Sequence, residues 1–242
     1  PLHFFIIINA TPEKSRIGII AVFFWGYDFP VLTIIFIFQS SSRGVHFFSA
    51  EGEIAMQRCG WVSQDPLYIE YHDTEWGVAQ KASQRLFEMI CLEGQQAGLS
   101  WITVLKKRQN YRQAFHQFDP VRVAAMGDED VERLLQDAGI IRHRGKIQAI
   151  IGNARAYLAM EENGESFTDF VWSFVDNAPQ VTRAATLAEI PTTTPASDAL
   201  SKALKKRGFK FVGSTICYSF MQACGLVNDH VTGCFCHPGG QD

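Results

Sequence analysis

The chain has 242 residues, of which 47% are hydrophobic and 19% charged, and its formal net charge at pH 7 is -3. This length suffices for one or two domains with a sizeable core. The nearly balanced charge argues against a strongly electrostatic nucleic-acid binder, although it leaves room for a local basic patch.

Residues 1–55 differ in composition from the rest of the chain. They hold long apolar runs, and all six cysteines lie after Met56. Residues 17–38 are long enough for a membrane segment, but Asp28 and Pro30 interrupt them. A secretory signal is disfavoured because a clean basic start and a small-residue cleavage site are missing.

The interpretation we favour is that residues 1–55 are a misassigned upstream extension. Glu51-Gly52-Glu53 is encoded by purine-rich codons and lies just before Met56, where a bacterial ribosome-binding site would stand. We therefore expect translation to begin at Met56 and residues 56–242 to form the functional domain. If the extension belongs to the native protein, the alternative is a membrane-anchored protein. Mass spectrometry of the native protein tests this, since a peptide from before Met56 would contradict it.

Residues 56–76 are rich in aromatic side chains but show little periodicity, so we expect a loop-like segment. The aromatic residues include Trp61, Tyr68, Tyr71 and Trp76. Aromatic side chains outside a regular element form either a satellite core or a stacking platform, and both alternatives stay open here.

Two helices with 3.6-residue apolar spacing flank the stretch 92–101. We expect the first to end near Gly98 and Ser100 to cap the second. This places the Glu93 carboxylate, an exposed Leu99 and the Trp101 indole close together. Such a set suits a pocket for a flat base extruded from DNA: an indole to stack, a carboxylate to read the base, and an apolar wedge for the vacated stack. The alternative is an ordinary helix pair with Trp101 in the core.

Further helices follow in chain order, and no long strand pattern occurs. We expect a helix from Asp119-Pro120 to Gly127, an acidic helix over 128–137, a helix opened by Arg142–Lys146, and an aromatic helix over 167–175. Residues 182–195 are expected to be an exposed linker. The predicted fold is an all-α bundle without repeats.

A glycine-bounded turn between two helices is the candidate DNA contact. Ser197 is expected to cap the first helix, and Gly208 and Gly213 enclose apolar residues before the second. Glycine lets the backbone approach a phosphate, and the amides of the next helix's first turn donate to it. With the lysines around it, the turn predicts helix–hairpin–helix chemistry. The predicted DNA-binding residues of this hairpin are Gly208, Lys210, Gly213 and Ser214.

Cysteine and histidine at both ends of the domain form a candidate metal site. His230-x3-Cys234 is a ligand pair, and Cys59 and His72 lie near the start of the domain. Two cysteines and two histidines make a closed, structural zinc site that would join the chain ends. The alternative is free thiols in a reduced cytoplasmic protein, for which we expect no disulfides. The rival ligands are Cys236 and His237.

Cys217-x6-Cys224 has the first spacing of the iron–sulfur cluster found in some helix–hairpin–helix repair enzymes. Cys234 and Cys236 do not continue that pattern. Because Cys217 and Cys224 fall in an apolar helix, we expect them to pack in the core and the protein to be colourless.

Several segments together resemble the bacterial 3-methyladenine DNA glycosylase I family. The resemblance covers residues 56–242 without large gaps, and the order of the motifs makes it specific. The matching segments are 56–61, 71–77, 92–101, 139–146, 208–213 and His230-x3-Cys234. The resemblance implies an all-α helix–hairpin–helix glycosylase with one bound zinc ion that joins the two ends of the domain.

The resemblance also implies roles for individual residues. The implied zinc ligands are Cys59, His72, His230 and Cys234. The flipped base is held by Glu93, taken as the catalytic residue, with Tyr71 and Trp101, while Trp61 and Tyr68 line the pocket. Leu99 resembles the wedge in the DNA stack. Asp229 is a candidate for steadying the sugar cation, but no catalytic role is assigned to it.

The expected activity is hydrolysis of the N-glycosidic bond of 3-methyladenine in alkylated double-stranded DNA. Since Ser214 and Thr215 stand where strand-cleaving relatives need a lysine nucleophile, we expect base removal without strand cleavage. We further expect a cytoplasmic monomer without membrane contact, unless residues 1–55 are real. Two rival functions are a non-catalytic DNA-binding module, which needs no aromatic pocket, and a zinc hydrolase, which needs an open metal position.

Overall fold

The structure is a computed structural model that describes residues 35–36, 48–49 and 57–239. The chain divides into two units, residues 1–55 and residues 56–242. In the first unit, the described residues are strands β1 (Ile35–Phe36) and β2 (Phe48–Ser49), which pair antiparallel. The prediction that translation begins at Met56 concerns residues that lie mostly outside the described part, and it stays a prediction.

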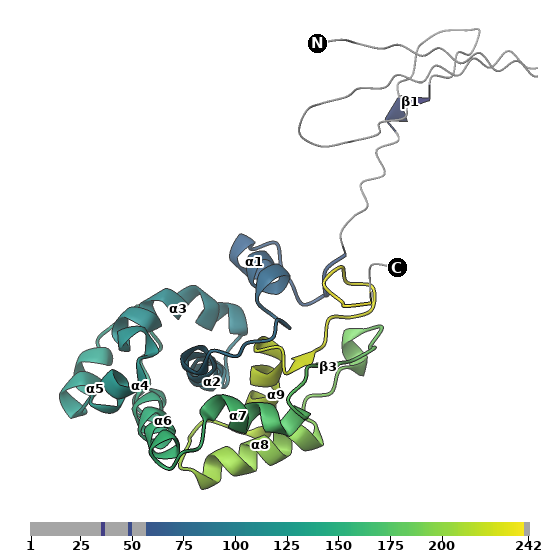
Figure 1. The fold of residues 1–242 in the computed structure, drawn as a ribbon. Coiled ribbons are helices and arrows are strands. Elements are labelled where there is room, and N and C mark those ends of the chain that lie inside the picture. The colour runs from purple at the N-terminus through teal and green to yellow at the C-terminus, as the bar shows by residue number, and fades with distance from the viewer. Residues whose placement is uncertain (1–34, 37–47, 50–56, 240–242) are drawn as a thin grey trace, which may run out of the picture. The chain divides into compact units, whose positions relative to one another are not determined.

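Helices dominate the second unit, and loops connect them (Figure 1). The α-helices are α1 (Pro66–Thr74), α2 (Ser83–Gln96), α3 (Trp101–Ala114), α4 (Pro120–Ala124), α5 (Asp128–Leu134), α6 (Arg144–Glu162), α7 (Phe167–Trp172), α8 (Pro195–Lys206) and α9 (Ser214–Ala223). Three 3-10 turns, η1 (His116–Phe118), η2 (Ser173–Val175) and η3 (Leu187–Glu189), and two parallel two-residue strands, β3 (Gln180–Val181) and β4 (Val227–Asn228), complete it. The all-α class expected from the sequence is confirmed.

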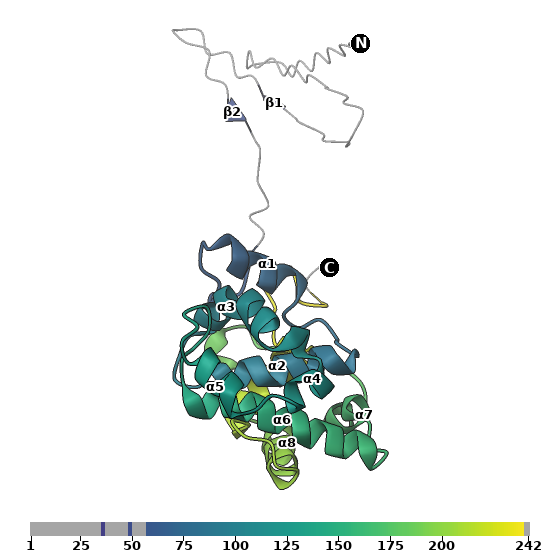
Figure 2. The ribbon, with the colours of Figure 1, turned by 90° about the vertical axis from the view of Figure 1, so that its left-hand side faces the viewer.

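Helix α2 runs through the middle of this unit (Figure 2). Every residue from 86 to 95 is buried, as expected for a helix that is covered on all sides. Helices α3, α6 and α9 pack against it, and α4 lies along α6. A polar group in the second half of α2, such as Glu93, is therefore held inside the protein.

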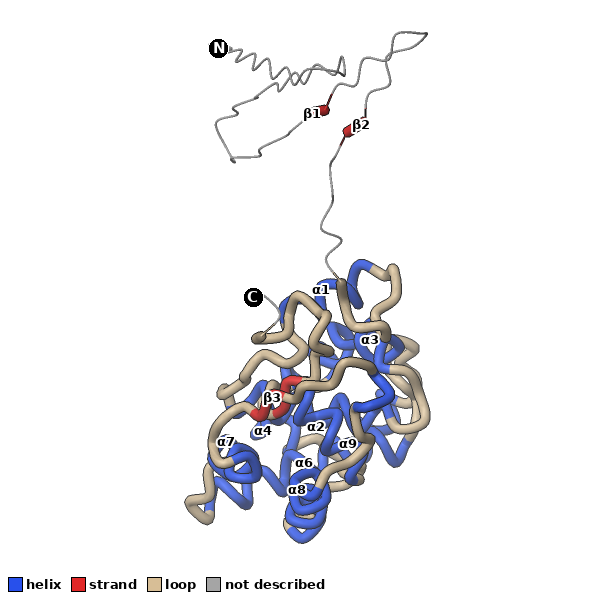
Figure 3. The backbone as a smooth tube through the Cα atoms, turned by 90° about the vertical axis from the view of Figure 1, so that its right-hand side faces the viewer, coloured by secondary structure: helices blue, strands red, loops and turns tan. Residues whose placement is uncertain are grey.

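The C-terminal segment returns to the start of the domain, as Figures 1 and 3 show. The Phe235 amide donates to the Gln57 carbonyl at 3.1 Å. This return brings Cys59 and His72 close to His230 and Cys234, although more than 150 residues separate the two pairs.

The expectation of a loop over residues 56–76 was wrong in part, because residues 66–74 form helix α1. Asp65 caps it with a side chain that accepts from the Leu67 amide at 3.1 Å, and Pro66 is its first residue. The same Asp-Pro signal starts α4 at Asp119-Pro120, where we did expect a helix.

Helix α8 begins earlier than expected. Thr194, not Ser197, is its N-cap, with a side chain that accepts from the Ser197 amide at 3.2 Å, and Pro195 occupies the first turn. The preceding linker is not wholly exposed either. Ala184 is buried, and its carbonyl accepts from the Thr232 amide at 2.9 Å.

Helix α5 ends at Leu134, three residues before the end expected for the acidic helix. The aromatic helix expected over 167–175 is divided into α7 and η2. Within the described residues, none of the helices combines the length and the apolar character that a membrane span requires.

Candidate active site

A cavity of about 230 Å³ lies among α1, α2, α3 and α9. Its lining residues are Trp61, Tyr68, Tyr71, Trp76, Glu93, Gln96, Trp101, Leu187, Ile190, Ser219 and Gln222. All five residues that we predicted to hold or surround a base are among them. The cavity is smaller than the roughly 300–1,000 Å³ of pockets for drug-sized ligands, so it suits a smaller molecule such as one heterocyclic base.

Five aromatic rings line the cavity. The Trp61 ring lies 4.9 Å from the Tyr68 ring and 5.1 Å from the Trp76 ring, between centroids, and Tyr71 lies 5.5 Å from Trp101. Tyr68 and Tyr71 are three residues apart on α1, so they share one face of the helix. Tyr71 and Trp101 are also buried core residues. These side chains therefore pack in the core and also line the cavity, and their use as a stacking platform stays a prediction.

Glu93 places a buried carboxyl group in the wall of this cavity. Its side chain is 2% exposed, and burial raises its pKa to about 8. Among the described residues, neither its Oε2 atom nor the Trp101 Nε1 atom has a hydrogen-bond partner. An unpaired buried polar group costs about 1–3 kcal/mol. Two such groups in one cavity, an acceptor and a donor, are what a polar ligand would satisfy.

Several cavity residues were not predicted from the sequence. These are Trp76, Gln96, Leu187, Ile190, Ser219 and Gln222. Ser219 and Gln222 are one turn apart on α9, but only the packing of α9 against α2 turns that face toward the cavity. Leu187 and Ile190 lie in the segment expected to be an exposed linker, where the sequence carries no periodic signal.

Asp229 does not line the cavity. It is fully buried, and its carboxylate accepts from Tyr218 Oη at 2.6 Å, Gln222 Nε2 at 2.7 Å and Thr182 Oγ1 at 2.8 Å. Both of its oxygens are engaged, and one of its partners, Gln222, lines the cavity.

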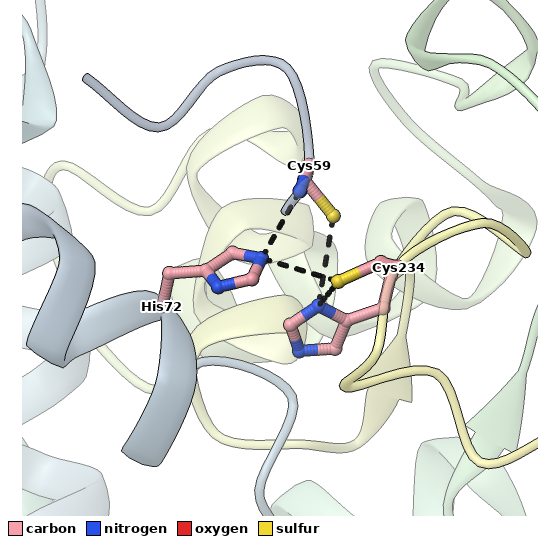
Figure 4. Close-up of side chains that lie close together, drawn as sticks. Cys59, His72 and Cys234 are labelled. Atoms are coloured by element: carbon pink, nitrogen blue, oxygen red, sulfur yellow. Dashed lines mark hydrogen bonds between the residues drawn. The ribbon is translucent and has the colours of Figure 1, made fainter. Parts of the chain in front are cut away.

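The four predicted zinc ligands lie together. One ligand atom from each of Cys59, His72, His230 and Cys234 falls within 4.8 Å of the others, and all four residues are buried. The side chains of Cys59, His72 and Cys234 point toward one another (Figure 4). Sulfur–nitrogen distances in the cluster are 3.4, 3.5 and 3.6 Å. A tetrahedral zinc ion separates its sulfur and nitrogen ligands by about 3.5–3.6 Å, so the donor set fits this metal.

The other ring nitrogen of each histidine is also engaged. His72 Nδ1 lies 2.7 Å from Asp73 Oδ1, and Arg58 donates to the same carboxylate. His230 Nε2 lies 3.0 Å from the Trp76 carbonyl. Partners of this kind fix the tautomer whose facing nitrogen carries no proton and can bind a metal. Trp76 therefore links the cluster to the cavity.

The rival ligands lie outside the four-residue cluster. His237 Nε2 is 2.9 Å from the Thr182 carbonyl, and its Nδ1 accepts from the Gly239 amide. Cys236 groups only with His72 and Asp73. Cys217 and Cys224 are buried in the core, as expected.

The predicted hairpin joins α8 to α9. Gly208 has a φ of +92°, which favours glycine, and Phe209 and Val212 bury their side chains beneath the turn. Four lysines around it are exposed, namely Lys202, Lys205, Lys206 and Lys210. Gly213 caps α9, and the Ser214 hydroxyl donates to Asp198, so the free donors at this helix start are backbone amides.

Leu99 occupies the turn between α2 and α3. Its side chain is 43% exposed, as predicted for a wedge, and Gly98 before it has a φ of +77°. Ser100 is the N-cap residue of α3, also as predicted. The cavity residues Glu93 and Trp101 lie on either side of this turn in the sequence.

Comparisons with known proteins agree on one family. The family model described as methyladenine glycosylase matches residues 61–237. DNA-3-methyladenine glycosylase 1 of Escherichia coli (strain K12) is 82% identical over 186 residues, which are 77% of this chain and 100% of the relative. A crystal structure of 3-methyladenine DNA glycosylase I is 82% identical with a TM-score of 0.75, covering 75% of this chain and 100% of that chain.

A more distant structure gives the same result. It is a structure of 3-methyladenine DNA glycosylase I from Staphylococcus aureus that concerns the recognition of 3-methyladenine, and that protein is 40% identical to this chain. Its TM-score is 0.73, with 76% of this chain and 98% of that chain covered. Together with the match of the family model over residues 61–237, these similarities show that the chain belongs to the methyladenine glycosylase family.

Proposed function

We propose that this protein is a DNA repair enzyme that hydrolyses the N-glycosidic bond of 3-methyladenine in alkylated double-stranded DNA. The observation that carries the proposal is the aromatic cavity with the buried, unpaired carboxyl of Glu93, in a chain of this family. A DNA-binding module without catalysis would need no such cavity.

The substrate's own chemistry suits this cavity. 3-Methyladenine in DNA carries a positive charge, so its glycosidic bond is already weak and the departing base is a good leaving group. Electron-rich rings favour a cation by about 0.5–2 kcal/mol each, and the carboxylate of Glu93 adds an opposite charge. Unmodified adenine carries no charge and gains little, which gives selectivity without a strong acid or base.

The bond change balances without a protein nucleophile. The electron pair of the glycosidic bond passes to the base, which leaves neutral, while water adds to C1′ of the sugar and loses one proton. The flipped base would reach the cavity from the duplex, with Leu99 filling the gap that it leaves in the stack.

The predicted zinc site has a structural role in this proposal. Cys59, His72, His230 and Cys234 would hold the ion and so join the two ends of the domain. Four protein ligands leave no position for a substrate or water, which is typical of structural rather than catalytic zinc. The rival function of a zinc hydrolase is disfavoured for this reason.

Base release without strand cleavage is the expected result with a methylated duplex. The α9 start offers serine and threonine after Gly213 but no lysine to form a Schiff base. Chromatography should detect free 3-methyladenine while a denaturing gel shows intact strands. Borohydride should trap no covalent DNA adduct, and a trapped adduct would overturn the assignment as a monofunctional glycosylase.

The helix–hairpin–helix proposed for α8, the turn 208–213 and α9 predicts salt-dependent DNA binding. Replacing Lys205, Lys206 and Lys210 by alanine, singly, should weaken duplex binding for all sequences. The slope of log K against log salt should fall by about 1 for each phosphate that the variant no longer neutralises. Titrations at several salt concentrations measure it; unchanged slopes for all three variants would place the DNA elsewhere.

A further inference from the structure

Two buried polar residues on α6 contact the two loops that the proposed function places against DNA. Lys146 is 6% exposed and Asn153 is 2% exposed. They stand seven residues apart, which is two helical turns, so they share one face of α6 about 10 Å apart along its axis. Each bonds the main chain of a different loop.

Lys146 contacts the end of α2, just before the Leu99 turn. Its Nζ atom donates to the carbonyls of Gln95 and Ala97, at 2.7 Å each, and Gln95 Nε2 donates back to the Lys146 carbonyl at 3.2 Å. The last carbonyls of a helix lack intrahelical partners, and a positive charge there also interacts favourably with the helix dipole. The ammonium therefore fixes where α2 stops and where Leu99 begins its turn.

Asn153 contacts the hairpin at Lys210. Its Oδ1 accepts from the Lys210 amide at 2.8 Å, and its Nδ2 donates to the Lys210 carbonyl at 3.2 Å. Both bonds go to the main chain, so they hold the turn while the Lys210 side chain stays exposed. The hairpin also rests on α2, since an added Cβ on Gly94 would come within 3.2 Å of Phe211 Cβ.

We propose that Lys146 and Asn153 are positioning residues that set the spacing between the Leu99 turn and the hairpin, so that both engage one duplex at once. The proposal rests on the proposed function, which places both loops against DNA. Burying an ammonium carries a desolvation penalty, and an apolar side chain would fill the same space without that penalty. Hydrogen bonds from side chains of one helix to the main chain of both loops would hold the two loops at a fixed spacing.

Binding measurements test this without base chemistry. We would measure the Kd of Lys146→Met and Asn153→Leu for a duplex with a tetrahydrofuran abasic analogue, which needs both loops. The Kd for free 3-methyladenine, followed by tryptophan fluorescence, reports the cavity alone. We expect duplex binding to weaken about tenfold and free-base binding to change less than twofold. Asn163→Leu is the matched control, because Asn163 is the C-cap residue of the same helix and, within the part of the chain that the structure describes, its side chain hydrogen-bonds only the Ala159 carbonyl.

The double variant separates positioning from simple structural damage. If displacing either loop is enough to keep both from engaging the duplex, the double variant Lys146→Met, Asn153→Leu should lose about 10- to 20-fold in duplex affinity. Two independent sites would together lose about 100-fold. If Lys146→Met does not fold, Lys146→Arg is the second variant. It keeps the positive charge on a side chain of different length, and its duplex affinity should fall about threefold.

Three results would overturn the proposal. These are a 100-fold, additive loss of duplex affinity in the double variant, a loss of free-base affinity as large as the loss of duplex affinity, or unchanged duplex affinity in the single variants. Base release is a separate readout. If the variants bind the duplex as expected but the wild-type protein releases no base, the proposed function is contradicted and the positioning role remains supported.

Discussion

Replacing Glu93 by glutamine is expected to lower kcat/KM for 3-methyladenine release about 10- to 100-fold, the size of a missing hydrogen bond to a charged group. The glutamine keeps the volume and one acceptor oxygen but removes the negative charge that attracts the cationic base. The pH profile should change as well. Because the pKa of Glu93 is raised to about 8, kcat/KM of the wild type should rise with pH, reach half of its maximum near pH 8 and level off about one pH unit higher, whereas the variant should lack this rise.

The same substitution should make the ligand-free protein more stable. Glu93 has a folded-state pKa of about 8 against an ordinary value of 4.5. Below pH 4.5 the carboxyl is protonated in both the folded and the unfolded state, so it does not lower the free energy of unfolding. As the pH rises from 4.5 to 8, only the unfolded state ionises freely, so stability is lost progressively, by about 5 kcal/mol in total at 1.4 kcal/mol per pKa unit. Glutamine does not ionise and escapes this loss.

Denaturant unfolding of both proteins from pH 5 to pH 9 measures this difference. The free energy of unfolding of Glu93→Gln minus that of the wild type should grow with pH up to about 8 and then stay constant. The subtraction removes other titrating groups that the two proteins share. A pH-independent difference, together with unchanged base release, would remove Glu93 from the proposed role.

Replacing Cys234 by alanine should abolish zinc binding and destabilise the protein by about 4 kcal/mol or more, as losing a structural metal does. Cys234 Sγ lies within 3.5 Å of the facing nitrogens of both histidines, so the substitution removes one of the four ligands of the cluster. Metal analysis should find one zinc per wild-type chain and none in the variant, and thermal unfolding should occur at a lower temperature.

Cys236→Ala is the matched control for Cys234→Ala. Cys236 belongs to the same loop and is partly buried, but it lies outside the cluster of four. The Cys236→Ala variant should keep one zinc ion per chain and a free energy of unfolding close to that of the wild type. Full zinc occupancy in Cys234→Ala with loss in Cys236→Ala would make Cys236 the ligand. A wild-type protein that binds no zinc would contradict the metal site altogether.

Local signals in the sequence predicted most of the helices and part of the candidate site, while the family resemblance implied the pocket positions of Trp61, Tyr68 and Tyr71. Apolar spacing located α2, α3 and α6, and the motifs around Glu93, Trp101 and Cys59 named residues that the fold gathers. Helix α1 was missed because its aromatic side chains serve a cavity and hide the 3.6-residue pattern. Asp65-Pro66 carried the signal that was overlooked.

Contacts that depend on tertiary packing could not be predicted. Leu187 and Ile190 line the cavity only because the linker before α8 is tied to β4 and to the C-terminal segment, through Thr182 and Ala184. Lys146 resembles an ordinary solvated residue at a helix start, and only the position of α2 shows that its ammonium is buried. Such roles follow from which elements meet, and helical periodicity alone does not specify that.

The most direct test of the account is to identify the base that the full chain releases from a methylated duplex, beside an unmethylated duplex of the same sequence. Mass spectrometry of the released bases should find 3-methyladenine from the first duplex only, with both strands intact, and much less of it with Glu93→Gln. No release by folded, zinc-loaded protein, or equal release of unmodified adenine, would contradict the claim that this cavity selects a cationic base.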